Sequence, residues 1–180
     1  MIIIEGSDQV GKTTLAKKLS KRISAELYGN DAHFERVYRH LSRPPADFDH
    51  LVGYIERVGP VVWDRFHLGA IAYGKLTKNG GCPTPKQMLW VQRYLRWQGA
   101  IVLVIHADRW WLKEQLDSTR TEMYKEDTIL DVNDIFRMIA KSSNHEEPYA
   151  DLEHDITDGN WPDDKMIDDL IQMWRERWQA

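Results

Sequence analysis

Apolar residues follow two different periods along this chain, and the period predicts where strands and helices lie. Met1 to Glu5 is a short β-branched run, which predicts a strand. After a glycine-bounded loop the apolar positions recur every four residues, as on the buried stripe of a helix: Leu15, Leu19, Ile23 and Leu27. The chain therefore begins with a strand, a loop and a helix.

Four further stretches of the sequence predict the remaining strands. They are residues 34–40 (FERVYRH), 59–66 (GPVVWDRF), 100–108 (AIVLVIHAD) and 152–157 (LEHDIT). The third of these is the clearest, because its residues 100–105 are all apolar. Continuous apolar runs are typical of parallel strands that are covered on both faces.

Helical patterns lie between and after these runs. One helix is predicted to start near Pro85 and run to Gln98, and another to span Trp110 to Leu116. Two more are predicted from apolar faces, one made of Val132, Ile135, Phe136 and Ile139, and one of Ile167, Leu170, Ile171, Trp174 and Trp178. Alternating strands and helices predict an α/β fold, with a central parallel sheet of about five strands between two helical layers.

Composition limits the size and the partners of the protein. A chain of 180 residues that is 42% hydrophobic suits one domain, residues 1–180. Its 24 Lys and Arg against 28 Asp and Glu give a net charge of -4, which makes nucleic acid an unexpected partner. The lone Cys82 and the absence of a long apolar segment predict a cytoplasmic protein without a membrane partner.

The loop after the first strand carries the strongest chemical signal. GSDQVGKT, residues 6–13, matches G-x-x-x-x-G-K-[ST] between a strand and a helix. Backbone N–H groups of such a loop turn toward phosphate oxygens, the lysine reaches the terminal phosphates, and the hydroxyl ligates magnesium. The sequence thus predicts an ATP and Mg²⁺ site, with Thr13 on the metal and these residues on ATP: Gly6, Gln9, Val10, Gly11, Lys12, Thr13 and Thr14.

The strand at 59–66 ends in a second candidate group, Asp64-Arg65-Phe66. Its carboxylate and guanidinium would project from the same sheet edge as the phosphate loop, where ligands of parallel sheets bind. An arginine suits bidentate binding of a substrate phosphate. No [NT]KxD motif, no DxxG after this strand and no apolar strand ending in Asp-Glu is present, which disfavours a GTPase switch or a motor.

These two segments, EGSDQVGKTT and DRFHLGAIAYG, resemble the thymidylate kinase and deoxynucleoside kinase superfamily of P-loop kinases. The resemblance implies a P-loop NTPase three-layer sandwich with a small helical lid at about residues 117–128. It implies that Asp8 approaches the deoxyribose 3′-hydroxyl, that Arg65 holds the substrate phosphate and that Asp64 lies near metal and phosphates. Phe66 and Tyr73 complete the substrate motif, and Trp161 is implied as an apolar face for adenine.

Gln9 stands where some members of this superfamily carry a catalytic arginine. The polar stretch 118–127 (STRTEMYKED) must then supply the cations that neutralise the phosphoryl group in flight. Arg120 and Lys125 are the candidates, together with Lys12 and Arg65 as catalytic residues.

The segment YRHLSRPP indicates whether the acceptor is a nucleoside or a nucleoside monophosphate. Nucleoside kinases place a carboxylate at the end of the second strand, whereas nucleoside monophosphate kinases place an arginine there. Arg39 and Arg43 occur here, with no carboxylate before Asp47. These arginines favour an acceptor that already carries a phosphate. Together with the resemblance, which implies a deoxynucleotide, they lead us to expect transfer of the γ-phosphoryl group of ATP to a deoxynucleoside monophosphate, with dTMP or a related pyrimidine nucleotide first.

Three alternatives stay open: a deoxynucleoside kinase, a DNA-directed kinase and a nucleotide sensor that catalyses no transfer. The aromatic helix around Trp90, Tyr94 and Trp97 is a candidate homodimer face, and core packing explains it equally well.

Overall fold

The computed structural model describes residues 1–29, 52–53, 55, 60–76, 84–118, 125–142, 149–157 and 160–179. Five parallel strands form one sheet in the order β2-β3-β1-β4-β5. The strands are β1 (Ile2–Gly6), β2 (Glu26–Tyr28), β3 (Val61–Asp64), β4 (Ile101–Ala107) and β5 (Leu152–Ile156). The glycine-bounded loop of residues 6–13, called the phosphate loop from here on, follows β1. It therefore starts from the central strand of the sheet.

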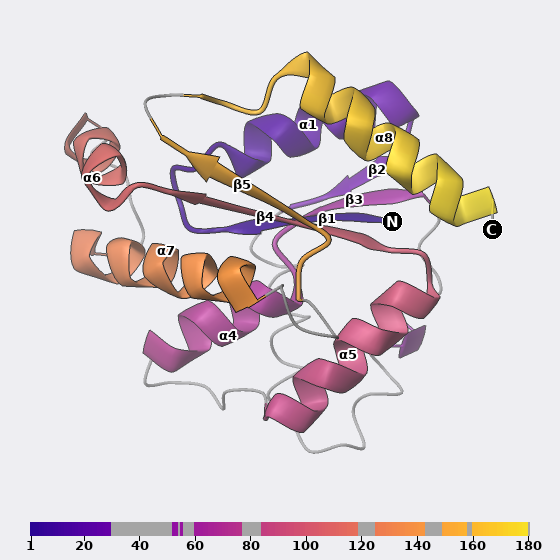
Figure 1. Ribbon diagram of the computed structural model, residues 1–180, viewed down its shortest axis with the longest axis horizontal. Helices are drawn as coiled ribbons and strands as arrows, with labels where there is room; N and C mark the ends of the chain where they lie inside the picture. The colour runs from indigo at the N-terminus through magenta and orange to yellow at the C-terminus, as the bar shows by residue number, and fades with distance from the viewer. Residues whose placement is uncertain are drawn as a thin grey trace.

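Helices cover both faces of this sheet, which confirms the predicted three-layer α/β fold (Figure 1). One layer holds α1 (Lys12–Ile23) and α8 (Asp164–Gln179), and the other holds α4 (His67–Leu76), α5 (Pro85–Trp97) and α7 (Glu126–Lys141). The remaining helix, α6 (Arg109–Ser118), follows the end of β4. Among the described helices, none has the length and apolar character needed to cross a membrane.

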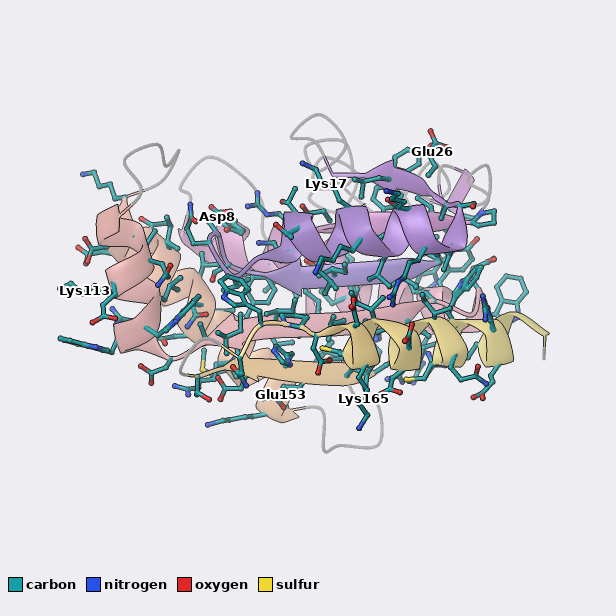
Figure 2. The ribbon with its side chains drawn as sticks, turned by 90° about the horizontal axis from the view of Figure 1, so that it is seen from above. Asp8, Lys17, Glu26, Lys113, Glu153 and Lys165 are labelled. Atoms are coloured by element: carbon teal, nitrogen blue, oxygen red, sulfur yellow. The ribbon has the colours of Figure 1, made fainter. Side chains whose placement is uncertain are left out.

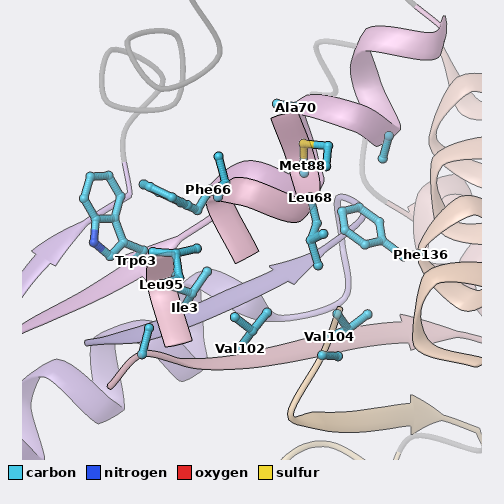
Figure 3. Close-up of a cluster of buried hydrophobic side chains, with 14 of the residues drawn as sticks. Ile3, Trp63, Phe66, Leu68, Ala70, Met88, Leu95, Val102, Val104 and Phe136 are labelled. Atoms are coloured by element: carbon cyan, nitrogen blue, oxygen red, sulfur yellow. The ribbon is translucent and has the colours of Figure 1, made fainter. Parts of the chain in front are cut away.

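The core has two parts because side chains of a strand alternate between its faces. Ile2 and Ile4 of β1 pack in the layer of α1 and α8, whereas Ile3 packs with α4, α5 and α7. Figure 3 shows this second part, with Val102 and Val104 of the sheet on the same side as Leu68 and Phe136 of the helices. The continuous apolar runs of the sequence are therefore strands buried on both faces.

The second strand differs from its prediction. Leu27 was predicted on the first helix, but α1 ends at Ile23. Leu27 lies in β2 instead, where it pairs with Val62 of β3. Ser24 caps the helix in a left-handed conformation, with φ of 51° and its N–H donating to Ser20. Leu27 still packs against the same core cluster as α1, which is why a helical period fits it. The strand predicted at 34–40 lies outside the described residues.

The helix predicted from Pro85 is confirmed, and its start has a clear cause. Thr84 and Gln87 form a capping box, in which the Gln87 N–H donates to Thr84 Oγ1 and the Thr84 N–H donates to Gln87 Oε1. Along this helix Trp90 stacks on Tyr94 at 5.4 Å between ring centroids, and Trp97 is 76% exposed. The homodimer face drawn from these residues stays a prediction.

The packing of α7 gives the first testable expectation. Phe136 is fully buried, whereas Met138 on the same helix is 61% exposed. Phe136→Ala should lower the free energy of unfolding by about 3–5 kcal/mol, because it removes buried surface and leaves a cavity. Met138→Ala, the matched control, should change it by less than about 0.5 kcal/mol. Urea denaturation measures both, and equal losses would contradict the described packing.

Candidate active site

The phosphate loop lies at the carboxyl edge of the sheet. Figure 2 places Asp8 at the end of the sheet where α1 begins, the same end as Lys113 and opposite to Glu26. Gly6 must be a glycine, because a Cβ there would lie 2.2 Å from the carbonyl oxygen of Ile105. Gly11 caps α1 with φ of 76° and without a side-chain cap, so the first N–H groups of α1 are available to an anion.

Lys12 and Thr13 stand in the first turn of α1 and reach different partners. The Lys12 ammonium donates to the carbonyl oxygen of Ser7 inside the loop, and the residue is 4% exposed. Thr13 Oγ1 donates to Asp64 Oδ2 at 2.5 Å, across from the end of β3. The loop and the neighbouring strand are thus joined at the residues that the sequence predicts for magnesium.

The oxygen pair of Thr13 and Asp64 suits Mg²⁺, which prefers hydroxyl, carboxylate and phosphate oxygens. Asp64 is 7% exposed, and its second oxygen, Oδ1, is buried without a hydrogen-bond partner among the described residues. That orphaned carboxylate oxygen is consistent with a metal or a metal-bound water. Within the described part of the chain, no group of three or more His, Cys, Asp or Glu is arranged as a metal site.

Arg65 is held in an uncommon conformation. Its φ of 72° is left-handed, which non-glycine residues adopt at a cost in strain. Its N–H donates to the Ile4 carbonyl oxygen at 2.9 Å, its guanidinium forms an ion pair with Asp8, and it lies 5.4 Å from the ring centroid of Tyr73. The side chains of Asp8 and Arg65, predicted separately, therefore meet at one place.

A cavity of about 590 Å³ opens beside these groups. This volume lies within the usual range for small-molecule sites, about 300–1,000 Å³. Trp161 covers one wall, because a Cβ at Gly11 would meet its ring at 2.2 Å, and Trp111 packs edge-on against it at 5.3 Å. The cavity is lined by Asp8, Gln9, Gly11, Lys12, Thr13, Thr14, Leu15, Lys18, Arg65, Trp161 and Pro162.

Several predicted residues lie elsewhere. The side chain of Val10 is buried in the core, which leaves its backbone for a ligand. Phe66 is also fully buried, 4.8 Å from the ring of Trp63, and does not line the cavity. Lys125 is exposed at the N-terminal cap of α7. Arg39, Arg43 and Arg120 lie outside the described residues, as does much of the predicted lid.

Two residues that sequence reasoning missed belong to this region. Lys18 lines the cavity, and its spacing of four residues from Thr14 is the signal that places both on one side of α1. Glu5 is completely buried at the end of β1. A single charged residue that ends the apolar run MIII is the signal for it, since buried carboxylates need dedicated partners.

The partners of Glu5 come from the start of α4. Its Oε1 accepts from the Leu68 N–H at 2.7 Å and its Oε2 from the Gly69 N–H at 3.1 Å. Burial raises the pKa of Glu5 to about 7, against the opposing effects of the backbone N–H groups of Phe66, Leu68 and Gly69 and of the Lys12 charge. His67 Nδ1 lies 3.6 Å from Oε1, and burial lowers the pKa of this histidine to about 4.

Comparison with known proteins supports the fold. No protein-family model matches the chain. The SPbeta prophage-derived protein YorR of Bacillus subtilis is 23% identical over 95% of this chain and 96% of its own length. The crystal structure of YorR in complex with phosphorylated GDP has a TM-score of 0.72, with 21% identity over 99% of this chain and 98% of that one.

More distant structures share the same architecture. Deoxyadenosine kinase from M. mycoides with bound dCTP has a TM-score of 0.53, at 17% identity over the full length of both chains. The chain has the fold of the P-loop kinases. Shikimate kinase from Aquifex aeolicus has it too, with a TM-score of 0.52 and 15% identity over 98% of this chain and 97% of that one. A fold shared by kinases of such different acceptors leaves the acceptor to the site itself.

The buried pair of Glu5 and His67 gives opposite pH dependences of stability. Folding raises the pKa of Glu5 from 4.5 to about 7, so its contribution is present below pH 4.5 and is lost as the pH rises to 7. Folding lowers the pKa of His67 from 6.5 to about 4, so its contribution is present above pH 6.5 and is lost as the pH falls to 4.

Relative to wild type, Glu5→Gln should therefore gain stability as the pH rises from 4.5 to 7, and His67→Gln should lose it from 4 to 6.5. Each change should be on the order of 1–3 kcal/mol. Urea denaturation at half-unit steps of pH measures both differences. Differences that stay constant with pH would contradict the pKa shifts that burial causes in these two residues.

Proposed function

We propose that this protein transfers the γ-phosphoryl group of ATP to a deoxynucleoside monophosphate. The observation that carries the proposal is the convergence of Lys12, Thr13 and Asp64 with Arg65 beside one cavity. The first three form a site for a nucleoside triphosphate and its metal, and Arg65 offers a second phosphate-binding group from the adjacent strand.

The residues would divide the work as follows. The N–H groups of the loop and Lys12 bind the donor phosphates, and Trp161 offers a flat apolar face for its base. Thr13 and Asp64 would hold Mg²⁺, which neutralises charge on the transferring phosphoryl group when bound. Arg65, oriented by Asp8, binds the phosphate of the acceptor. An acceptor phosphate is already ionised, so alignment and charge neutralisation suffice and no general base is required.

The second candidate is a deoxynucleoside kinase, which would phosphorylate a 5′-hydroxyl. It is favoured by the fold shared with M. mycoides deoxyadenosine kinase. The dTMP-like acceptor comes from the resemblance of the sequence, whereas the phosphorylated GDP bound to YorR brings guanine nucleotides into consideration. Release of ADP from ATP and Mg²⁺ should therefore be measured with all deoxynucleoside monophosphates, GMP, GDP, the matching nucleosides and single-stranded DNA.

Turnover confined to monophosphates would support the proposal and identify the base. Turnover with nucleosides, or with single-stranded DNA, would replace the proposal with that alternative. ATP binding without turnover of any acceptor would contradict the proposal and favour the nucleotide sensor that catalyses no transfer.

Lys12→Ala should lower kcat by at least about a hundredfold, because it removes the cation nearest the donor phosphates. Lys17→Ala is the matched control, since Lys17 is an exposed lysine of the same helix that does not line the cavity. Circular dichroism should show both variants folded. Wild-type turnover by Lys12→Ala would overturn the role given to the loop.

Arg65→Ala should raise the KM of the acceptor by a factor on the order of ten to a hundred, with a smaller change in the KM of ATP, because a charge-assisted contact is lost. Arg22→Ala serves as control, because Arg22 pairs with Asp164 and Asp168 on α8 and does not line the cavity. Steady-state kinetics with each substrate varied in turn separates the two constants. Equal effects on both would contradict an acceptor role for Arg65.

A further inference from the structure

Glu5 connects the strand of the phosphate loop to the helix that follows Arg65. Both of its carboxylate oxygens are used, one by the Leu68 N–H at 2.7 Å and the other by the Gly69 N–H at 3.1 Å. These are first-turn N–H groups of α4, which have no acceptor within their own helix. A carboxylate at this position satisfies them and interacts favourably with the helix dipole.

Arg65 lies between two attachments to β1. On one side its own N–H donates to the Ile4 carbonyl oxygen at 2.9 Å. On the other side Glu5 holds the first turn of α4, and α4 also carries Tyr73, whose ring centroid lies 5.4 Å from the Arg65 guanidinium. A shift of that turn would therefore move both the backbone and the aromatic support of Arg65.

His67 lies beside the carboxyl group, with Nδ1 3.6 Å from Oε1 and no hydrogen bond to that nitrogen among the described residues. Gln92 Nε2 donates to the Tyr149 carbonyl oxygen at 3.1 Å, so Gln92 Oε1 must be the atom that faces His67 Nε2 at 2.7 Å. The neutral imidazole then carries its proton on Nε2 and turns an unprotonated Nδ1 toward Glu5. The other charges that act on this pair are Lys12 on Glu5 and Asp151 on His67.

We propose that Glu5 is a positioning residue for the acceptor phosphate, because its two oxygens hold the first turn of α4 and thereby place the Arg65 guanidinium. The inference rests on the proposed function for the identity of the ligand, but the placement of Arg65 is observable without it. Glutamine at this position has the same shape and only one carbonyl oxygen, so one of the two N–H groups would lose its acceptor.

The first arm of the test observes the placement directly. The Arg65 side-chain N–H resonance, assigned by its loss in Arg65→Lys, should shift or broaden in Glu5→Gln, and the Leu68 or Gly69 amide should exchange faster with solvent. Leu95→Val, a fully buried change in α5, is the control for general destabilisation and should leave these signals unchanged. Unchanged Arg65 and α4 signals in Glu5→Gln would overturn the inference, whatever the enzyme does.

The second arm measures turnover with the acceptor that the panel identifies. Glu5→Gln should raise the KM of the acceptor by about tenfold or more and that of ATP by less than about twofold, since a misplaced binding group costs this much. Leu95→Val should change neither ratio. Equal effects on both KM values would overturn the inference, whereas a wild-type protein that accepts no monophosphate, with the first arm positive, would overturn the proposed function alone.

Wild-type protein provides the test if Glu5→Gln does not fold. The Leu68 and Gly69 amides and the Arg65 side-chain N–H should then titrate together as Glu5 takes up its proton. Independent titration of the amides and of Arg65, or no titration, would overturn the positioning role.

Discussion

The register of β1 against β3 is the constraint on which the rest of the site depends. Ile4 stands beside Asp64, one residue before the phosphate-loop strand reaches its buried glutamate. Because β3 ends at Asp64 beside Ile4, Thr13 reaches the Asp64 carboxylate and the Arg65 N–H reaches the Ile4 carbonyl oxygen. A slip of one residue would exchange the faces of the strand and bury Asp64 away from the loop. Packing of apolar side chains on both faces prevents that slip. The core therefore also determines where the polar side chains of the candidate site lie.

The carboxyl edge of the sheet holds strained backbone conformations as well as the charged residues of the candidate site. Gln9 and Arg65 are both left-handed, at φ of 66° and 72°, in the two loops that face each other. Such conformations persist where surrounding contacts determine them. Here the ion pair between Asp8 and Arg65 joins the loops, and Glu5 anchors the helix behind them. Preorganised charge of this kind is what the proposed phosphoryl transfer requires, because it acts without rearrangement during the reaction.

Much of the fold and several of the residues that line the cavity could be predicted from the sequence, and specific residues show where prediction stopped. The glycine loop and the Asp64-Arg65 pair follow from local patterns, because a turn and a strand end are local events. Leu27 was assigned to the wrong element, since a spacing of four also suits a strand residue that packs beside the helix. Glu5 was missed because its partners, the N–H groups of Leu68 and Gly69, lie more than sixty residues away.

By itself, the sequence determined the alternation of strands and helices, the phosphate loop and the candidate pair at the end of β3. These features depend on the period of apolar side chains and on short motifs, both of which involve residues close together in the sequence. Only the tertiary structure decided that Trp161 lies over Gly11, that Asp8 pairs with Arg65 and that Glu5 and His67 are buried together. Each of these contacts joins residues that are distant in the chain, and the strand order β2-β3-β1-β4-β5 brings their elements together. A local sequence pattern does not specify which distant strand becomes a neighbour in the sheet. Packing of the whole core determines the strand order.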